Sequence, residues 1–358
     1  MIHVTKSYLP DIDTYIEKIK LIWENHWLTN NGPLLTQLEA QLKRYVGTEH
    51  MLYTNNGTIV LQMALKALGI TKEVITTPFS YVATTNSILW EGCTPVFADI
   101  NEYDFNIDAD LIESKITDNT QAILVTHVFG NPCDVEKIEA IAKKHSLKVI
   151  YDAAHAFGVE YKGKSLLTYG DMSTCSFHAT KVFHTIEGGC ITANDNDLFR
   201  KLYLYRQFGH EGDDYYDIGI NAKASEFHAA MGLCVMDALG DIIRHRKKVS
   251  ISYDGQLNFN KIRKPISPFE ITYNYAYYPV VFESEEILLN VKAGLEANGI
   301  MARRYFYPSL NTLPFLEKKD VCVNSELISK KILCLPLSSY LQDSEVDTIC
   351  RIINTIIE

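Results

Sequence analysis

The 358-residue chain lacks the features that would place it in a membrane, outside the cell or on a nucleic acid. It has no uninterrupted apolar run of about 18 residues, so no transmembrane helix is expected. Its first residues lack a basic patch followed by a long apolar stretch, so no secretory signal is expected. Lys and Arg number 34 against 44 Asp and Glu, and this net charge of −10 disfavours nucleic acids and anionic membranes. We therefore expect a cytoplasmic protein that binds neither a nucleic acid nor a membrane.

The short motifs of several enzyme and metal-binding classes are also missing. The eight cysteines are scattered without a C-x-x-C pair, as expected of buried thiols in a reducing compartment. H-E-x-x-H, G-x-S-x-G and G-x-G-x-x-G do not occur, which removes the commonest zinc-protease, hydrolase and dinucleotide-binding classes. No metal ion is expected as a cofactor.

One segment matches the sequence of a phosphate-binding motif but is not predicted to have its structure. Residues 158–165 match G-x-x-x-x-G-K-[ST], which binds phosphates where a strand leads into a helix. Here Val159-Glu160-Tyr161 is predicted as a strand, Lys162-Gly163-Lys164 as a hairpin turn and Ser165-Leu166-Leu167 as its return. Glu160 would also repel a phosphate. We therefore predict a hairpin and reject nucleotide hydrolysis.

What the sequence does contain is the pattern of a folded α/β protein, with 47% apolar and 22% charged residues. Short apolar strands alternate with helices, which is typical of a mostly parallel sheet covered on both faces. Strands are predicted at 51–54, 73–77, 95–99, 122–127, 148–152, 189–192 and 275–281, and helices at 13–27, 35–46, 59–68, 80–89, 111–116, 135–144, 198–207, 225–245, 287–298 and 344–357. We predict a large domain over residues 1–245 and a smaller C-terminal α+β domain over residues 246–358.

Lys181 is the first candidate for chemistry, because it is the one Lys or Arg between residues 165 and 199. It lies in the largely apolar segment Ser176–His184. Partial burial lowers the pKa of a lysine and so supplies the neutral amine that a Schiff base needs. Taken alone, such a lysine more often extends its ammonium group into water at a domain edge.

Asp152 strengthens the interpretation of Lys181. It ends the predicted strand 148–152, and the carboxyl ends of strands in open α/β sheets face the ligand crevice. An acid there can pair with the protonated ring nitrogen of pyridoxal phosphate (PLP), or it can simply cap a helix. His155 follows closely, although a lone histidine of this kind more often belongs to the core.

Other residues could hold the phosphate and the ring of such a cofactor. Gly57 and Thr58 lie between a strand and a helix, where unpaired N–H groups and the helix dipole favour an anion. Ser176 could add a second hydroxyl group. Tyr81 could stack on a flat heterocycle or pack in the core.

Together these segments resemble one family, the sugar aminotransferases of the DegT/DnrJ/EryC1/StrS group, which are PLP enzymes of fold type I. The resemblance runs in family order over nearly the whole chain. It implies a large α/β domain with a mostly parallel seven-stranded sheet between helices, and a smaller α+β C-terminal domain. The segments that carry it are Asn56–Thr58, Thr77–Thr84, Pro95–Asp99, Asp152–Gly158, Ser176–Lys181, Glu187–Gly189, Gly209–Gly212 and Gly219–Asn221.

The resemblance also implies site roles. Lys181 would be the Schiff-base lysine and proton shuttle, and Asp152 the partner of the pyridine nitrogen. The cofactor-binding set would be Gly57, Thr58, Tyr81 stacked on the ring, Asp152, His155 near the ring and its 3-hydroxyl, Ser176, Lys181 and Asn221.

Asn221 would reach the phosphate in the neighbouring subunit, which implies a homodimer with shared active sites. The family commonly has Arg two residues later, where this chain has Lys223. A related dehydratase branch replaces the Schiff-base lysine with histidine, so Lys181 favours transamination.

Three segments, 27–33, 149–163 and 302–310, look like the family members that make dTDP-4-amino-4,6-dideoxyglucose. The resemblance implies transfer of the amino group of L-glutamate to the 4-keto carbon of dTDP-4-keto-6-deoxy-D-glucose, for surface polysaccharide (O-antigen) synthesis. Thr29, Arg303 and Arg304 are candidates for contacting this sugar nucleotide together with Lys181, although the two arginines could also lie in a solvated turn.

Several alternatives stay open at this point. The enzyme could be specific for C3 or act on a UDP- or GDP-keto sugar. It could hold PLP as a scaffold without catalysis, or have another fold type I activity such as that of an aldolase or a desulfurase.

Overall fold

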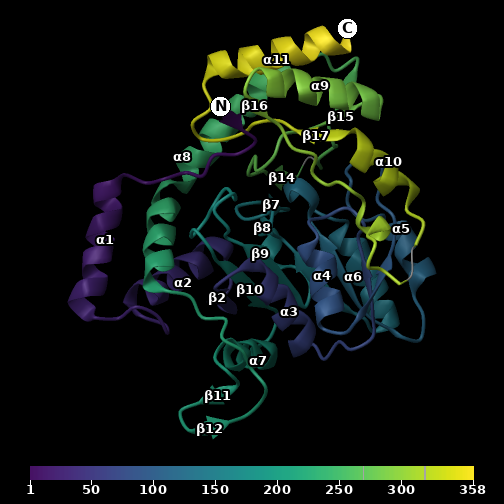
Figure 1. Ribbon diagram of the computed structural model, residues 1–358. Coiled ribbons are helices and arrows are strands. Elements are labelled where there is room, and N and C mark those ends of the chain that lie inside the picture. The colour runs from purple at the N-terminus through teal and green to yellow at the C-terminus, as the bar shows by residue number, and fades with distance from the viewer. Residues whose placement is uncertain (269, 318–319) are drawn as a thin grey trace.

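The computed structural model describes residues 1–268, 270–317 and 320–358. A seven-stranded sheet forms the centre of this part of the chain (Figure 1). Six of its strands run in the same direction, and β10 runs antiparallel to both of its neighbours. In spatial order the strands are β2 (Met51–Thr54), β10 (Gly189–Ala193), β9 (Met172–Ser176), β6 (Lys148–Asp152), β5 (Thr120–Thr126), β3 (Glu73–Thr76) and β4 (Thr94–Phe97).

The central strands are apolar along their whole length because both faces of the sheet are covered. Successive side chains of a strand point to opposite faces. Leu124 and Ile150 therefore belong to one buried cluster, whereas Ile123 and Val149 belong to another. The prediction of a mostly parallel sheet between helices is confirmed.

Helices cover the sheet, and local residues set where they begin and end. Asn56 caps α3 by accepting hydrogen bonds from the Thr58 and Ile59 N–H groups, and Gly47 ends α2 with φ +78°. These helices are α2 (Pro33–Val46), α3 (Gly57–Ala67), α4 (Ala83–Trp90), α5 (Ala109–Ile112), α6 (Val135–His145) and α7 (Asn196–Arg206), with 3₁₀ turns at Glu113–Lys115, Val128–Gly130 and Leu166–Thr168.

The C-terminal elements pack beyond the sheet, at the top of Figure 1. Strands β13 (Ile262–Arg263), β15 (Pro279–Phe282) and β17 (Ile332–Cys334) pair antiparallel. The N-terminus joins them, since β1 (Ile2–His3) pairs with β16 (Ile300–Met301). Around these strands lie α9 (Glu285–Ala297), the 3₁₀ turn Leu310–Thr312, α10 (Val323–Lys331) and α11 (Asp343–Ile357).

Helix α8 (Glu226–Gln256) connects the two ends of the molecule. The sequence predicts its end at His245, but the helix continues because Val249 and Tyr253 keep the helical spacing and pack into the C-terminal core. Leu233 and Leu239 of the same helix pack into the core beside the sheet. A division between residues 245 and 246 would thus fall inside a continuous helix, and it stays a prediction.

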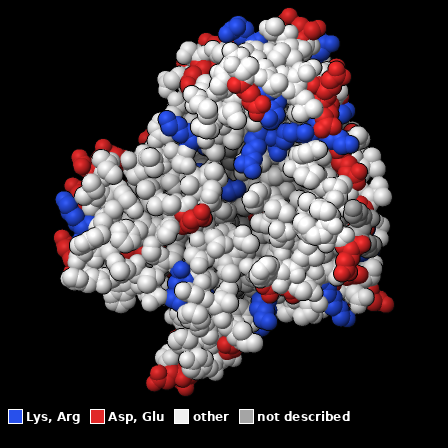
Figure 2. Space-filling view, in the orientation of Figure 1, with Lys and Arg blue, Asp and Glu red and all other residues white. Residues whose placement is uncertain are grey.

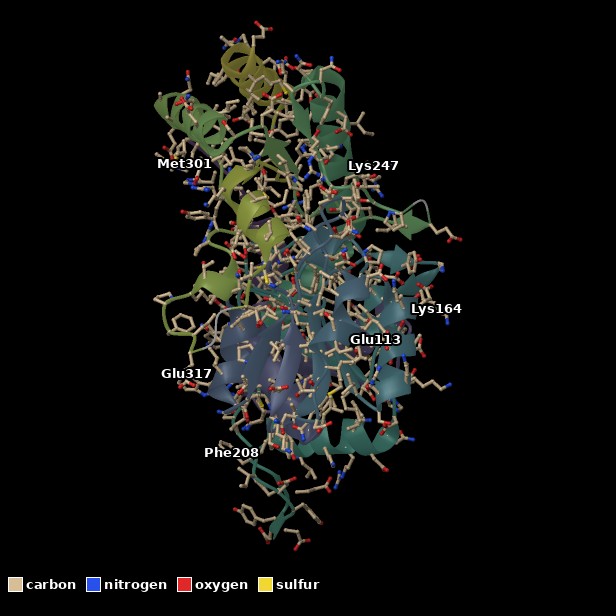
Figure 3. All side chains as sticks on the ribbon, turned by 90° about the vertical axis from the view of Figure 1, so that its right-hand side faces the viewer. Glu113, Lys164, Phe208, Lys247, Met301 and Glu317 are labelled. Carbon is tan, nitrogen blue, oxygen red and sulfur yellow. The ribbon has the colours of Figure 1, made fainter. Side chains whose placement is uncertain are left out.

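The hairpin predicted in place of a phosphate-binding loop is confirmed. Strands β7 (Glu160–Tyr161) and β8 (Lys164–Ser165) pair antiparallel through a turn with positive φ at Lys162 and Gly163. The return is shorter than predicted, since Leu166 begins a 3₁₀ turn. Lys164 lies at the outer edge of the molecule (Figure 3), and β7 also pairs with β14 (Ile271–Thr272).

Three other sequence predictions differ from the structure. Strand β9 was not predicted, because Met-Ser-Thr-Cys-Ser has few strongly apolar residues although it lies in the middle of the sheet. The predicted strand at 275–281 is shifted to Pro279–Phe282, since the preceding tyrosine-rich segment packs around His155 and Lys181. The helix predicted from Ser80 begins at Ala83.

Two elements extend from the body of the molecule in Figure 1, helix α1 (Ile12–Asn25) and the hairpin of β11 (His210–Glu211) and β12 (Asp214–Tyr215). Figure 3 shows Phe208 at the base of this hairpin. No helix in the described ranges is long and apolar enough to cross a membrane. Within the same ranges, no three His, Cys, Asp or Glu side chains lie together as metal ligands would.

Candidate active site

Lys181 and Asp152 lie near the carboxyl ends of β9 and β6, close enough for each to act on the charge of the other. Asp152 is the last residue of β6, and Lys181 lies in the segment after β9. Burial lowers the pKa of Lys181 and raises the pKa of Asp152, and the charge of each residue opposes the shift of the other. The Lys181 Nζ donates a hydrogen bond to the Tyr277 hydroxyl at 3.3 Å. The site thus holds a lysine and a carboxyl group within each other's electrostatic reach.

Asp152 is only 6% exposed, and two hydrogen bonds hold its carboxyl group. Its Oδ1 accepts from the Ala154 N–H at 3.0 Å, and its Oδ2 accepts from the Thr84 hydroxyl at 2.7 Å. Both donors stabilise the ionised carboxylate against the cost of burial. The carboxyl group is thereby fixed in orientation as well as in charge.

His155 is a buried donor beside this pair. Its Nδ1 accepts a hydrogen bond from the Phe129 N–H at 3.2 Å, so its ring hydrogen lies on Nε2. Burial lowers the pKa of His155 well below its usual value, which keeps the ring neutral. The Phe306 ring lies parallel to it, with centroids 5.4 Å apart.

The N-terminus of α3 and Ser176 form a close-packed cradle. A Cβ atom on Gly57 would lie 2.6 Å from the Ser176 Cβ, so this approach requires glycine. The Ser176 Oγ accepts from the His178 N–H at 3.4 Å, which leaves the serine hydrogen to be donated. The Thr58 N–H is already bound by the Asn56 side chain, so Thr58 offers its exposed hydroxyl group instead.

These residues fit PLP. A carboxylate for a ring nitrogen, an amine for an aldehyde, and a helix N-terminus with two hydroxyl groups for a phosphate lie around one site. Ser176, His155 and Lys181 line the same small cavity of about 10 Å³. Tyr81 acts electrostatically on Lys181 and is 54% exposed, so its ring is not part of the core.

Asn221 and Thr29 do not line the cavity at Lys181. Both line an open hollow of about 680 Å³ that shares no residue with the cavity at Lys181. The Asn221 carbonyl oxygen accepts from the Asn55 side chain at 3.3 Å, near the start of α3. Lys223 lies over the Phe208 ring, 4.6 Å from its centroid.

The side chains of the two candidate arginines, Arg303 and Arg304, have different contacts. Figure 2 shows a band of basic side chains over the region of β17 and α10, above a hollow in this face. Arg303 stacks on the Tyr305 ring at 4.7 Å, and its charge opposes the rise in the pKa of Tyr277. Arg304 instead forms an ion pair with Glu285 at 2.7 Å. Arg303 therefore lies on the Lys181 side, and the Arg304 guanidinium is already engaged.

Several residues around Lys181 were not singled out from the sequence. Tyr277 contacts the lysine, and the Asn274 side chain donates to the carbonyl oxygens of His155 and Phe157, both at 2.9 Å. They lie in the tyrosine-rich run 273–278, which has no diagnostic spacing. Only its composition marks this run, and composition does not say what it contacts.

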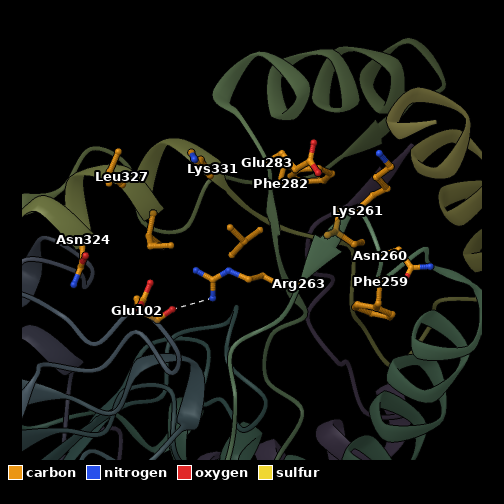
Figure 4. A pocket seen from close by; sticks show the side chains of 13 residues that line it. Glu102, Phe259, Asn260, Lys261, Arg263, Phe282, Glu283, Asn324, Leu327 and Lys331 are labelled. Carbon is orange, nitrogen blue, oxygen red and sulfur yellow. Dashed lines mark hydrogen bonds between the residues drawn. The ribbon is translucent and has the colours of Figure 1, made fainter.

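A larger groove lies apart from these residues (Figure 4). It has a volume of about 470 Å³ and shares no lining residue with the cavity at Lys181. Arg263 crosses it and donates to the Glu102 carbonyl oxygen at 2.9 Å. Size alone therefore does not locate the chemistry of this protein.

Comparisons with known proteins agree with this geometry. A profile of the DegT/DnrJ/EryC1/StrS aminotransferase family matches residues 11–354. A Shigella dysenteriae protein named dTDP-4-amino-4,6-dideoxy-D-glucose transaminase is 41% identical over 99% of both chains. The solved structure of DesI in the presence of its TDP-sugar product has a TM-score of 0.94 at 29% identity, covering 99% of this chain and 92% of the other.

The PLP form of the putative sugar aminotransferase Spr1654 from Streptococcus pneumoniae has a TM-score of 0.89 at 26% identity, covering 98% of each chain. The predicted fold is confirmed by these likenesses.

Proposed function

The chain belongs to the DegT/DnrJ/EryC1/StrS aminotransferase family, and from this premise we propose that it converts dTDP-4-keto-6-deoxy-D-glucose into dTDP-4-amino-4,6-dideoxy-D-glucose. The amino donor is L-glutamate, which leaves as 2-oxoglutarate, and the amino group replaces the keto oxygen at C4. The product is a precursor for surface polysaccharide, made in the cytoplasm. The proposal rests on the closeness of Lys181 and Asp152. It is supported by the likeness of the chain, over 99% of its length, to a protein named dTDP-4-amino-4,6-dideoxy-D-glucose transaminase.

PLP is the cofactor of this family, and when bound it withdraws electrons from the carbon that carries the amino group. Lys181 would hold it covalently through Nζ, and its free amine would take and return a proton at the same nitrogen. Burial lowers the pKa of Lys181, which favours the neutral form of the amine. Asp152 would pair with the ring nitrogen as a carboxylate, and His155 would offer its Nε2 hydrogen to the bound cofactor.

The phosphate and the sugar nucleotide are bound by separate groups. Gly57, Thr58 and Ser176 would hold the cofactor phosphate at the N-terminus of α3, where Gly57 packs against Ser176. The diphosphate of the sugar nucleotide needs a cation, because the protein carries a net charge of −10. Arg303 is the better placed of the two arginines, since its guanidinium stacks beside Tyr305 without an acidic partner among the described residues, whereas Arg304 pairs with Glu285.

The substrate assignment predicts a sharp preference among keto sugars. With L-glutamate and the PLP-loaded protein, dTDP-4-keto-6-deoxy-D-glucose is expected to give a kcat/KM at least about 100-fold above those of 3-keto isomers and of UDP- or GDP-linked keto sugars. Buried polar groups of the protein that hydrogen-bond one sugar nucleotide are left without partners when a different one binds, and this lowers kcat/KM. Mass spectrometry and NMR of the amino-sugar product measure this directly.

Other outcomes of the same assay identify the alternatives. A higher kcat/KM with a 3-keto sugar or with a UDP- or GDP-sugar would replace the proposed substrate. Bound PLP without formation of 2-oxoglutarate from L-glutamate would indicate a scaffold rather than an enzyme. Deamination of L-glutamate alone tests the first half of the reaction independently of the sugar.

A homodimer with shared active sites is part of the proposal. Large apolar side chains are exposed on the two elements that extend from the body, among them Ile12 and Trp23 of α1 and Tyr215 and Ile218 of the hairpin region. Exposed apolar surface of this kind is typical of an interface. Asn221 follows the hairpin and lies outside the Lys181 cavity of its own subunit, which supports its action in the partner's site.

Mixed dimers test the shared site. Lys181→Ala and Asn221→Ala subunits are each expected to have low activity alone. Their co-assembled mixture should recover about a quarter of wild-type activity, since half of the dimers are hybrids and each hybrid has one intact site.

A mixture of Lys181→Ala with the Lys181→Ala/Asn221→Ala double variant is the matched control, and it should recover none. No recovery in the first mixture, with hybrids verified by mass spectrometry, would place Asn221 in the site of its own subunit.

A further inference from the structure

Three buried hydroxyl groups form a connected cluster behind Asp152. The Ser80 Oγ lies 2.8 Å from the Thr84 Oγ1 and 2.8 Å from the Thr126 Oγ1. All three residues are at most 1% exposed, so water does not compete for these bonds. They come from different elements: Ser80 precedes α4, Thr84 lies in its first turn, and Thr126 ends β5 beside Asp152 of β6.

Hydrogen counting gives the cluster a direction. Asp152 faces the cluster as an acceptor, so the single hydroxyl hydrogen of Thr84 is used in the 2.7 Å bond to Oδ2. The bond between Ser80 and Thr84 must then use the Ser80 hydrogen, so Ser80 donates to Thr84. The bond between Ser80 and Thr126 in turn uses the Thr126 hydrogen, so Thr126 donates to Ser80. The three O–H groups therefore point along one chain, from Thr126 through Ser80 and Thr84 to the carboxyl group.

We propose that Ser80, Thr84 and Thr126 act as a hydroxyl chain that holds Asp152 as a carboxylate, so that it can keep the ring nitrogen of bound PLP protonated. Thr84 would be the positioning residue that bonds Asp152. Ser80 and Thr126 would act through Thr84. The inference deepens the proposed function, because it rests on the role given there to Asp152.

The other groups around Asp152 cannot replace these donors. Lys181 is its cationic neighbour, but the amine loses its charge in part of the reaction. Burial lowers the pKa of His127 to about 3 and that of His155 well below its usual value, so both rings are neutral. Burial raises the pKa of Tyr277, so its hydroxyl stays protonated. The lasting support therefore comes from neutral donors, the hydroxyl groups and the Ala154 N–H.

Thr85 provides a matched control for Thr84. The two threonines are neighbours in α4 and are both fully buried. The Thr85 hydroxyl finds no hydrogen-bond partner among the described residues, whereas the Thr84 hydroxyl binds Asp152. A change from threonine to valine removes the same atoms at both positions, so a difference between the two variants reports the lost hydrogen bond.

The decisive measurement is the titration of Asp152 in the apoenzyme. With ¹³C-labelled aspartate, the Asp152 carboxyl signal is assigned by its disappearance in Asp152→Asn and followed by NMR from acid to neutral pH. Thr84→Val is expected to move the midpoint to higher pH, Ser80→Ala to move it less, and Thr84→Ser and Thr85→Val to leave it near the wild-type value. These results do not depend on any catalytic activity, so they stand even if the proposed substrate is wrong.

Cofactor affinity gives the second readout. Hydrogen bonds to charged groups contribute about 1.5–3 kcal/mol, so Thr84→Val should weaken equilibrium PLP binding about 10- to 100-fold at pH 8. Thr84→Ser should restore most of it. An unchanged Asp152 midpoint in Thr84→Val would overturn the proposal, even if PLP binding were weaker, because packing alone would then explain the loss. Equal shifts in Thr84→Val and Thr85→Val would overturn it as well.

Discussion

Lys181→Ala is expected to lower kcat by at least about 10³-fold and to leave PLP without a covalent link to the protein, because one amine serves both as nucleophile and as proton carrier. The wild-type protein should be yellow and should keep a mass increment after borohydride reduction. The variant should lose this increment under the same conditions. Absorbance spectra, intact mass and steady-state rates measure the three effects.

Two lysine variants serve as controls for Lys181→Ala. Lys181→Arg keeps the positive charge but supplies no neutral amine, so it should be as inactive as the alanine variant. Lys164→Ala removes the lysine of the apparent phosphate-binding motif, which lies on the outer hairpin, and should leave the rate unchanged. Substantial turnover in Lys181→Ala would remove the mechanism, and loss of activity in Lys164→Ala would reopen the rejected motif.

Asp152→Asn is expected to lower kcat by about 10²- to 10³-fold, the usual effect of removing one preorganised electrostatic contact. The amide can still accept from the Ala154 N–H, so the local fold should survive. It carries no negative charge, and therefore it cannot keep a ring nitrogen protonated. PLP should still bind to Lys181, but with lower affinity.

Asp152→Asn keeps the size of the side chain and removes its negative charge, so it tests the charge alone. Thermal unfolding of the apoenzyme should be little changed or raised, since burial raises the pKa of Asp152 and a neutral amide avoids that desolvation cost. Activity within twofold of wild type would exclude Asp152 as the ring-nitrogen partner. A large loss of apoenzyme stability would instead indicate that Asp152 mainly holds β6 and α4 together.

Much of the fold follows from local sequence signals. Strand 148–152 is a run of apolar residues ending in aspartate, and its observed bounds are those predicted. The glycine in Lys162-Gly163-Lys164 predicts a hairpin turn, and the structure has positive φ at Lys162 and Gly163. By contrast, β9 is buried in the middle of the sheet although three of its five residues are Ser or Thr. Its place depends on pairing with β6 and β10, which no local pattern encodes.

The same division applies to the site. Lys181 stands out because charge is rare in its surroundings, and Asp152 because it ends a strand, so both could be chosen from the sequence. Tyr277 could not, because it reaches Lys181 across 96 residues of chain. Arg303 and Arg304 are neighbours with identical side chains, yet one stacks near Tyr305 and the other pairs with Glu285.

The sequence by itself determined the family, the parallel sheet, and the lysine and carboxyl group on which PLP chemistry depends. These are carried by residue type, by spacing and by the positions of strand ends, which are local properties of the chain. Only the tertiary structure decided what surrounds the carboxyl group. Thr84 bonds Asp152, and Ser80 and Thr126 join behind Thr84, because the start of α4 and the ends of β5 and β6 lie at one edge of the sheet. Hydrogen bonds depend on distances of a few tenths of an ångström between such elements, and the packing of the whole domain sets those distances.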